Sequence, residues 1–351
     1  MLSHGERADA LLHELGYAQW RDGQREAVIA ALEGRDSLIV MPTGGGKSLC
    51  YQLPGLASEE LTIVVSPLIA LMRDQWGKLN AGGHRVTMIT SGMEDWEASE
   101  SLEMVRGDAR IVYCAPERFA SNVFLEALSH RKVDLIAVDE AHCVSEWGHD
   151  FRPDYLRIGP LVERLGSPTV LALTATASPP VREEIVERLR MRDPELIIRG
   201  FDRPNIRLEV DHHHDENRKR RALVERVAAL DRPGIVYTAT RKLAEEVAGE
   251  LEEAGLRARP YHAGLAKSER NEAQEAFMDD ELDVIAATTA FGMGVDKPNV
   301  RFVFHSEPSD SVDSYYQEVG RAGRDGSDAR ALLFYRAEDL GIRRFFAGGS
   351  R

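Results

Sequence analysis

The feature that most constrains the fold is an alternation of short, β-branched apolar runs with amphipathic segments of helical spacing. The first series of runs covers residues 37–41, 61–66, 86–90, 110–114, 133–138 and 169–173. Most of these runs are apolar at every position, which is typical of strands buried on both faces of a sheet. Strands that alternate with helices form parallel sheets, so the sequence predicts an α/β fold with helices above and below the sheet.

A second series of apolar runs follows the first. It covers residues 234–237, 258–261, 283–287, 301–305 and 331–335. The clearest helix in this part is residues 242–254, which Thr240 is placed to cap. Residues 199–206 separate the two series, are rich in turn formers and have no helical period. The 351 residues suit two domains of about 100–200 residues each. We therefore predict domains at 1–199 and 200–351, each a mostly parallel sheet covered by helices on both faces.

Composition excludes several classes of protein. No stretch approaches the roughly 18 uncharged apolar residues of a membrane span, and residues 1–10 lack the basic head and apolar run of a signal peptide. We therefore expect a cytoplasmic protein that does not enter membranes. The net charge of −14 opposes coating of nucleic acid by the whole surface but allows a local basic groove. The three cysteines form no C-x-x-C pair, so we expect buried thiols without a disulfide.

Two charged tracts near the start of the second domain have a plain structural interpretation. His212-His213-His214 resembles a metal-binding tract, but three consecutive side chains cannot all face one ion on a regular element. Arg218-Lys-Arg-Arg221 follows several acidic residues and precedes an apolar helical pattern. We expect solvated surface at both tracts, with a solvated helix start at the second.

The strongest local signal is Met41-Pro-Thr-Gly-Gly-Gly-Lys-Ser48, between an apolar run and an expected helix. The glycines let consecutive backbone N–H groups turn toward one anion, and the following helix start adds partial positive charge. A lysine in this position reaches the β- and γ-phosphates, and the serine hydroxyl completes a Mg²⁺ shell. We assign ATP and Mg²⁺ to this loop, through Thr43, Gly44, Gly45, Gly46, Lys47 and Ser48.

An acidic pair completes this expected nucleotide site. Asp139-Glu-Ala-His142 follows the apolar run at 133–138, at the strand end where α/β sheets place their ligands. We expect Asp139 to hold Mg²⁺ and Glu140 to orient and deprotonate the attacking water.

Arginines outside the loop are also needed, because negative charge develops on the γ-phosphoryl oxygens. The second domain contains Gln317-Glu-Val-Gly-Arg-Ala-Gly-Arg-Asp325, in which Arg321 and Arg324 are three residues apart. On a helical turn both would point the same way. If they reach the nucleotide, the catalytic site exists only when the two lobes close.

The ordered set of motifs resembles the motor of superfamily two helicases, and more narrowly the RecQ family of DNA helicases. The resemblance runs from about residue 11 to residue 335. Besides the segments already quoted, it rests on Val65-Ser-Pro-Leu-Ile-Ala-Leu71, Ala115-Pro-Glu-Arg118, Leu173-Thr-Ala-Thr-Ala177, Tyr261-His-Ala-Gly264 and Phe291-Gly-Met-Gly-Val-Asp-Lys-Pro-Asn-Val-Arg301. It implies two RecA-like domains that bind ATP between them and single-stranded DNA across both.

Ser145-Glu-Trp-Gly-His-Asp-Phe-Arg-Pro153 is similar to the aromatic-rich loop by which that family senses single-stranded DNA. Trp147 and Phe151 offer flat faces for bases, and His149 and Arg152 add polar reach. The resemblance adds Arg118 and His262 as DNA contacts.

The resemblance also assigns residues around the nucleotide. It implies that Tyr17 stacks on adenine, that Arg21 and Gln24 make polar contacts with adenine, and that Asp296 contacts the ribose. It further implies that His142 and Gln317 couple the acidic pair to the second domain. Many family members continue into a zinc-binding element and a winged helix. No four-cysteine cluster occurs here, so we expect neither, and we expect the chain to be a fragment.

The resemblance thus implies an ATP-dependent helicase that moves 3′ to 5′ on single-stranded DNA and unwinds duplex DNA in repair or recombination. We expect a monomer that works at the bacterial nucleoid. Two other functions stay open. The first is a translocating ATPase, on RNA for example, that does not unwind efficiently. The second is a non-catalytic annealing module switched by ATP.

Overall fold

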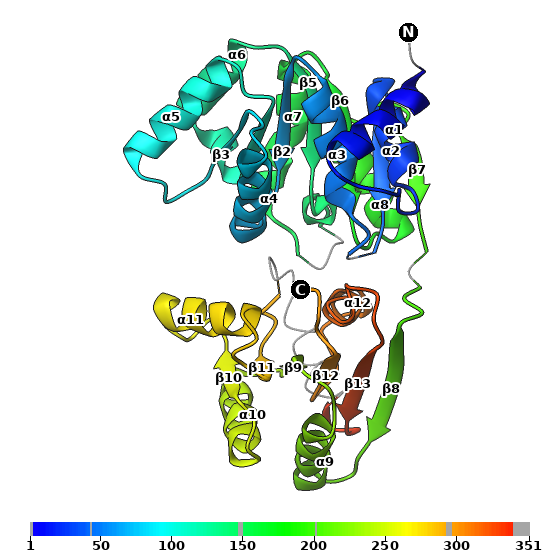
Figure 1. The fold of residues 1–351 in the computed structure, drawn as a ribbon, viewed down its shortest axis with the longest axis vertical. Helices are drawn as coiled ribbons and strands as arrows, with labels where there is room; N and C mark the ends of the chain where they lie inside the picture. The colour runs from blue at the N-terminus through cyan, green and yellow to red at the C-terminus, as the bar shows by residue number, and fades with distance from the viewer. Residues whose placement is uncertain (1–2, 43, 147–149, 201, 293–296, 340–351) are drawn as a thin grey trace. The chain divides into compact units, whose positions relative to one another are not determined.

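The structure of this chain is a computed structural model that describes residues 3–42, 44–146, 150–200, 202–292 and 297–339. The chain divides into two compact units, Met1–Phe201 and Asp202–Arg351, whose helices and strands are labelled in Figure 1. Four of the expected site residues, Thr43, Trp147, His149 and Asp296, lie outside the described residues.

The described part of the first unit contains a parallel sheet of seven strands in the order β3-β4-β2-β5-β6-β1-β7. The strands are β1 (Ser37–Val40), β2 (Leu61–Val65), β3 (Val86–Ile89), β4 (Ile111–Cys114), β5 (Val133–Val138), β6 (Thr169–Thr174) and β7 (Glu195–Ile198). Alternate residues of each central strand enter two different cores. Ile63 and Val65 pack on one face, and Val64 packs on the other.

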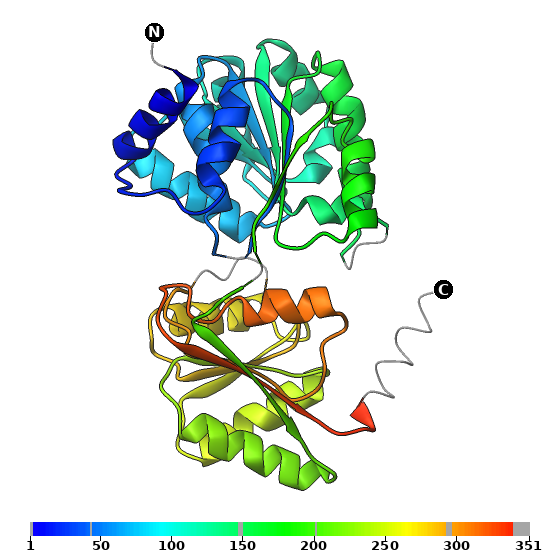
Figure 2. The same ribbon diagram turned by 90° about the vertical axis from the view of Figure 1, so that its right-hand side faces the viewer.

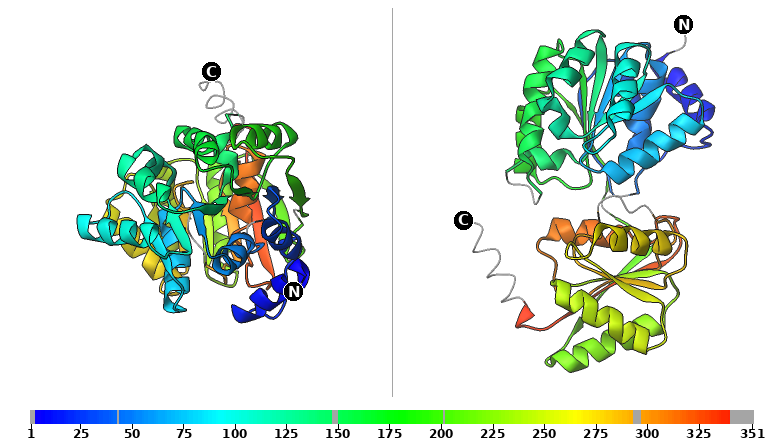
Figure 3. Two further views of the ribbon diagram at one scale, coloured as in Figure 1. Left: turned by 90° about the horizontal axis from the view of Figure 1, so that it is seen from above. Right: turned by 90° about the vertical axis from the view of Figure 1, so that its left-hand side faces the viewer.

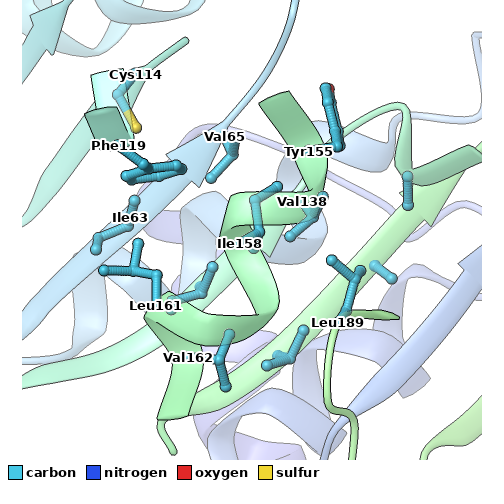
Figure 4. Packing of buried hydrophobic residues seen from close by; sticks show 14 of the residues in the cluster. Ile63, Val65, Cys114, Phe119, Val138, Tyr155, Ile158, Leu161, Val162 and Leu189 are labelled. Carbon is cyan, nitrogen blue, oxygen red and sulfur yellow. The ribbon is translucent and has the colours of Figure 1, made fainter. Parts of the chain in front are cut away.

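Helices cover both faces of this sheet, as Figures 2 and 3 show. They are α1 (His4–Glu14), α2 (Gln24–Leu32), α3 (Lys47–Ala57), α4 (Ile69–Ala81), α5 (Asp95–Arg106), α6 (Asn122–Ser129), α7 (Ile158–Arg164) and α8 (Pro179–Arg188). Helices α5 to α8 contribute to one core and α2 to α4 to the other. In Figure 4, Ile158, Leu161 and Val162 of α7 lie against Ile63 and Val138 of the sheet. Three short 3-10 helices, Pro116–Ala120, Ala141–Val144 and Pro153–Arg157, follow strands or loops of this unit.

The described part of the second unit contains a parallel sheet of six strands in the order β10-β11-β9-β12-β13-β8. The elements are β8 (Ile206–His212), α9 (Glu216–Ala228), β9 (Gly234–Tyr237), α10 (Arg241–Glu253), β10 (Ala258–Tyr261), α11 (Lys267–Met278), β11 (Val284–Ala287), β12 (Phe302–His305), α12 (Val312–Val319) and β13 (Ala329–Tyr335). Helices α9 and α10 pack on one face, and α11 and α12 pack on the other. The predicted α/β class with two RecA-like sheets is confirmed.

Two strands were not predicted from the sequence, and both lie at sheet edges. Strand β7 has an exposed Leu196, and β8 exposes Leu208 and Val210 between charged residues. An edge strand is covered less than a central one, so its apolar run is short or interrupted. The turn formers before Ile206 also made this segment resemble a linker.

The expectation of a solvated helix start at residues 218–221 is wrong for Lys219. Its side chain is 1% exposed and forms ion pairs with Asp339 at 2.9 Å and with Glu307 at 3.4 Å. A buried ammonium needs such partners, because an unpaired one would cost several kcal/mol of solvation. The lysine therefore ties α9 to the segment that follows β13. Within the described residues, no helix has the length and apolarity needed to cross a membrane.

Candidate active site

The polar motifs of the first unit gather at one edge of its sheet, because they all follow strands that run in parallel. The phosphate loop follows β1, Asp139 follows β5, Ser66 follows β2, and Thr174 ends β6. These four strands are consecutive in the sheet, in the order β2-β5-β6-β1. The carboxyl ends of parallel strands are where α/β proteins bind their ligands. The sheet order therefore brings the loop and the acidic pair together.

The phosphate loop has the backbone that its glycines allow. Gly44 and Gly46 have φ angles of 81° and 77°, in the left-handed region that other residues avoid. Gly46 is the residue before α3, and Lys47 is the first residue of that helix. The Lys47 ammonium donates to the carbonyl oxygens of Met41, at 3.1 Å, and Pro42, at 3.4 Å. The lysine thus lies across the loop at a helix start, where an anion is favoured.

Two residues assigned to adenine are instead engaged with the loop itself. Gln24 is 1% exposed. Its amide nitrogen donates to the Gly46 carbonyl at 2.9 Å, and its amide oxygen accepts from the Arg21 N–H at 2.7 Å. The Arg21 guanidinium donates to the Gly44 carbonyl. Both side chains therefore shape the phosphate loop, and their contacts with adenine stay a prediction. Tyr17 is 47% exposed and available for stacking.

Asp139 is held in place by hydrogen bonds to both its side chain and its backbone. Its carboxylate accepts from the Ser66 hydroxyl at 3.2 Å, and its backbone carbonyl accepts from the Tyr155 hydroxyl at 2.9 Å. Burial raises the pKa of Asp139 above its ordinary value, and the Glu140 carboxylate adds to the rise, whereas the Lys47 ammonium lowers it. The effect of Lys47 shows that the loop lysine acts on this carboxylate.

Glu140 and His142 form the second half of this acidic box. Glu140 has a φ angle of 47°, an uncommon left-handed conformation for a residue with a side chain. Its Oε2 is buried, makes no hydrogen bond within the described residues, and lies 3.4 Å from His142 Nδ1. The same Nδ1 is 2.9 Å from the hydroxyl of Thr174. The acidic box is therefore joined to the end of β6 through the histidine.

These residues fit a hard divalent cation such as Mg²⁺. Such ions prefer carboxylate, hydroxyl and water oxygens. Asp139 offers a buried carboxylate whose charge is disfavoured by its surroundings, and Ser48 offers a hydroxyl at the start of α3. A bound cation would stabilise the charged form of Asp139 and so offset the cost of its burial.

The end of the aromatic-rich motif, residues 150–153, is anchored to the residue that follows the acidic box. The Arg152 N–H donates to the Cys143 carbonyl at 2.9 Å. The Arg152 guanidinium donates to Asp150 at 2.9 Å, and the Phe151 side chain is 36% exposed. Arg118 lies on the 3-10 helix Pro116–Ala120, which contacts the 3-10 helix Pro153–Arg157. The expected DNA contacts of Phe151, Arg152 and Arg118 are untested and stay predictions.

In the second unit, two arginines lie near the end of the central strand β9. Arg321 and Arg324 are in the turn after α12, rather than on a helix. Burial raises the pKa of Tyr237 to about 12, whereas the charges of both arginines lower it. The Tyr237 hydroxyl donates to the Phe291 carbonyl at 2.7 Å. A Cβ at Gly292 would lie only 2.9 Å from Arg321 Nη2, so this glycine gives the guanidinium its space.

A buried network fixes α12, which carries Gln317. Glu318 accepts from the Ser309 hydroxyl at 2.6 Å and lies 2.8 Å from His305 Nε2 at the end of β12. The Gln317 amide nitrogen is buried and makes no hydrogen bond within the described residues. His262 is 2% exposed, accepts from the Gly264 N–H at 3.2 Å and faces Glu245 at 3.1 Å. Contact between His262 and DNA would need a rearrangement, and that role stays a prediction.

Comparisons with known proteins identify the family. Residues 21–185 match the DEAD/DEAH box helicase family, and residues 218–326 match the helicase conserved C-terminal domain. The chain is 42% identical over 94% of its length to the ATP-dependent DNA helicase RecQ of Pasteurella multocida, and 43% identical over 97% to RecQ of Bacillus subtilis. The chain belongs to the RecQ family of helicases. It spans 52% and 58% of those two relatives.

A third relative is matched over more of its length. The probable ATP-dependent DNA helicase RecS of Bacillus subtilis is 41% identical over 93% of the chain, which spans 66% of that protein. Among solved structures, the DUF1998 helicase MrfA bound to DNA has a TM-score of 0.78 at 20% identity, over 98% of this chain and 53% of its own. A single-substitution variant of Dbp5 of S. cerevisiae, bound to RNA and ADP BeF3, has a TM-score of 0.73 at 18% identity, over 98% of this chain and 92% of its own. These structural likenesses establish the RecA-like helicase fold.

Four residues of this RecQ-family site had no role in the sequence analysis. Ser66 hydrogen-bonds Asp139, and Thr174 hydrogen-bonds His142. Both lie in sequence motifs at the carboxyl ends of strands, where α/β proteins bind their ligands. Tyr237 also ends a strand. Tyr155 has no such signal, because nothing in its surroundings in the sequence shows that its hydroxyl reaches the Asp139 carbonyl.

Proposed function

We propose that this chain is the motor of an ATP-dependent DNA helicase that moves 3′ to 5′ on single-stranded DNA and unwinds duplex DNA in repair or recombination. The observation that carries the proposal is the convergence of Lys47, buried Asp139 and buried Glu140 Oε2 at one sheet edge. A lysine on a phosphate loop beside two carboxylates is the arrangement that nucleoside triphosphate hydrolysis requires.

ATP binding follows from the loop geometry. The backbone N–H groups of the loop and the start of α3 favour the phosphates, and Lys47 exchanges its carbonyl partners for phosphate oxygens. Tyr17 stacks on adenine through its exposed face. Ser48 and Asp139 would hold Mg²⁺, which supplies positive charge to the β- and γ-phosphates when bound.

Hydrolysis depends on Glu140, which orients a water molecule and accepts its proton as the bond to the γ-phosphate forms. Its buried Oε2 accepts no hydrogen bond from the part of the chain that the structure describes, so it can take up that proton. His142 lies beside this oxygen and fixes it relative to β6 through Thr174. We propose that Gln317 relays the state of the acidic box to the second unit, and that Arg321 and Arg324 stabilise the charge of the transferred phosphoryl group.

Binding to DNA is proposed from the relatives and the exposed groups near the acidic box. The three relatives are named as DNA helicases or probable DNA helicases, whereas the solved structures of this fold include complexes with DNA and with RNA. Phe151 offers an exposed ring to a base, with about 1–3 kcal/mol expected for each stacked base. The backbone N–H of its neighbour Arg152 donates to the carbonyl of Cys143, the residue after the acidic box, so ordering by DNA can reach the hydrolytic groups.

The test is ATP hydrolysis without nucleic acid, with single-stranded DNA and with RNA of the same sequence, each over a salt series. We expect strong stimulation by DNA that falls steeply as salt rises, because phosphate contacts release counterions. Strand separation on partial duplexes with 3′ or 5′ overhangs then reports unwinding and direction. Stimulation by RNA alone would replace this proposal with an RNA translocase.

A further inference from the structure

A cluster of three metal-binding side chains lies between the acidic box and the aromatic-rich segment, and no role has been given to it. His142, Cys143 and Asp150 each offer one donor atom, and the three atoms lie within 4.8 Å of one another. The Cys143 sulfur is 3.8 Å from His142 Nε2 and 3.7 Å from Asp150 Oδ2. His142 and Cys143 are buried, and Asp150 is half-buried.

The spacing of these donors is close to that of a tetrahedral zinc site. Zinc binds sulfur at about 2.3 Å and imidazole nitrogen or carboxylate oxygen at about 2.0–2.2 Å, which places neighbouring donors about 3.5 Å apart. The two separations that include the sulfur exceed this value by only a few tenths of an ångström. The third pair, His142 and Asp150, is within 4.8 Å, so these two side chains would have to move toward each other to close the cluster around an ion.

The outer contacts of the cluster also match those of metal sites. The Thr174 hydroxyl donates to the Thr176 carbonyl at 2.8 Å, so it accepts from His142 Nδ1–H. The proton of the neutral ring is then on Nδ1, and the lone pair is on Nε2, the atom that faces the Cys143 sulfur. Asp150 Oδ2 itself accepts from the Arg152 guanidinium, so a bound ion would share this oxygen with the arginine or displace it. Protein metal ligands are commonly oriented by partners of these kinds.

We propose that His142 Nε2, Cys143 Sγ and Asp150 Oδ2 form a regulatory site for Zn²⁺. On binding, the Zn–S bond replaces the S–H bond of Cys143, and the thiol proton passes to the solvent. Three protein ligands leave a fourth position for a water molecule. A thiolate and an imidazole select Zn²⁺ over Mg²⁺, which prefers oxygen ligands, so the site is chemically separate from the expected Mg²⁺ position.

Zinc at this position inhibits hydrolysis. The ion cross-links the residues that directly follow Glu140 to Asp150, at the start of the segment that carries Phe151. It would fix the acidic box and the DNA-sensing segment in one arrangement, whereas a motor must change that arrangement in each cycle. The binding of zinc does not depend on the proposed function, but the inhibition does, so binding and hydrolysis are measured separately.

The binding experiment uses Co²⁺ as a spectroscopic substitute for Zn²⁺, with the folded chain and no nucleotide. We expect a thiolate-to-cobalt charge-transfer band in the near ultraviolet that added Zn²⁺ abolishes and Mg²⁺ does not. Cys143→Ser should remove the band, and Asp150→Asn should weaken Zn²⁺ binding by more than roughly tenfold. Cys114→Ser is the matched control, because Cys114 is also buried but lies on β4 outside the cluster. It should keep the band.

The hydrolysis experiment adds Zn²⁺ to the DNA-stimulated reaction at saturating Mg²⁺ and ATP. The zinc concentration that inhibits hydrolysis should match the concentration at which Zn²⁺ displaces Co²⁺ in the binding experiment. In Asp150→Asn, inhibition should need a higher zinc concentration. The proposal is overturned if the parent chain gives no thiolate band, if Cys143→Ser keeps it, or if Cys114→Ser loses it. A band without inhibition would keep the site and remove its regulatory role. The absence of hydrolysis in zinc-free parent protein would instead count against the proposed function.

Discussion

The two units share one architecture but place opposite charges at the ends of their strands. In the first unit, Asp139 and Glu140 follow the central strand β5 and meet the loop lysine. In the second unit, the end of the central strand β9 is Tyr237, which packs with Arg321 and lies near Arg324. The comparison shows that two similar sheets differ mainly in the polar residues at the ends of their central strands.

The two units also differ in how their charged groups are stabilised. Asp139 is buried with one hydroxyl donor to its carboxylate, and its charged form is disfavoured. Arg321 lies close enough to Tyr237 to lower its pKa, and Gly292 leaves room for the Arg321 guanidinium. The first site therefore gains from a bound cation, whereas the second already holds its cations in place. Under the proposed function, the first unit would bind the nucleotide with its cation, and the arginines of the second would act on the charge of the phosphoryl group.

The largest expected effect tests whether the second unit contributes to hydrolysis. Arg324→Ala and Arg321→Ala should each lower DNA-stimulated ATP hydrolysis by roughly 10³ to 10⁵, as the loss of an arginine finger does. Nucleotide binding to the first unit should change much less. Arg330→Ala is the matched control, since this arginine lies on β13 of the same unit and contacts Glu209. Hydrolysis by Arg324→Ala at the parent rate would mean that the second unit supplies no catalytic cation.

The next effect tests the acidic pair. Glu140→Gln removes the proton acceptor but keeps the shape of the side chain, and it should lower hydrolysis by roughly 10² to 10⁴. Binding of a fluorescent ATP analogue should be retained. The exposed Glu163→Gln on α7 serves as a carboxylate control. A Glu140→Gln variant that turns over ATP like the parent would favour the non-catalytic annealing module.

A smaller effect tests the link between the acidic box and β6. Thr174→Val removes the hydroxyl that accepts from His142 and should lower DNA-stimulated hydrolysis about tenfold, which corresponds to about 1.4 kcal/mol. Thr62→Val is a matched control in the same sheet. Its hydroxyl is buried and makes no hydrogen bond within the described residues, so its removal should be neutral or stabilising. Equal effects of the two variants would show that the His142 contact has no catalytic importance.

The smallest effect concerns the hydrogen bond from Tyr155 to the Asp139 carbonyl. Tyr155→Phe removes one buried hydrogen bond, of about 0.5–1.5 kcal/mol. The Tm of the first unit should fall by about 2–4 °C per kcal/mol lost, measured by calorimetry. An unchanged Tm would show that the hydrogen bond from Tyr155 is not needed to hold Asp139 in place.

Much of this architecture could be predicted from the sequence. Runs apolar at every position identified the central strands, because a strand buried on both faces has no polar side. The phosphate loop and the acidic box could be placed at one edge because both follow such runs. Thr240 caps α10 as expected, with its side chain accepting from the Leu243 N–H.

Long-range contacts could not be predicted in the same way. Three contacts join residues that are distant in sequence. Gln24 donates to the Gly46 carbonyl, Lys219 pairs with Asp339, and Tyr155 donates to the Asp139 carbonyl. A local pattern predicts the element on which a residue lies, but the partner depends on how elements pack. Lys219 is the clearest case. Its basic neighbours predict solvent exposure, whereas its partners Glu307 and Asp339 become neighbours only in the assembled sheet.

The left-handed backbone of Glu140 lowers the thermal stability of the chain at the position proposed for the hydrolytic base. This conformation costs a residue with a side chain about 1–2 kcal/mol that a glycine would not lose. Glu140→Gly should thus give a chain that resists heating better while losing its hydrolytic base. If Glu140 is the base that we propose, the chain gives up this stability for the sake of hydrolysis.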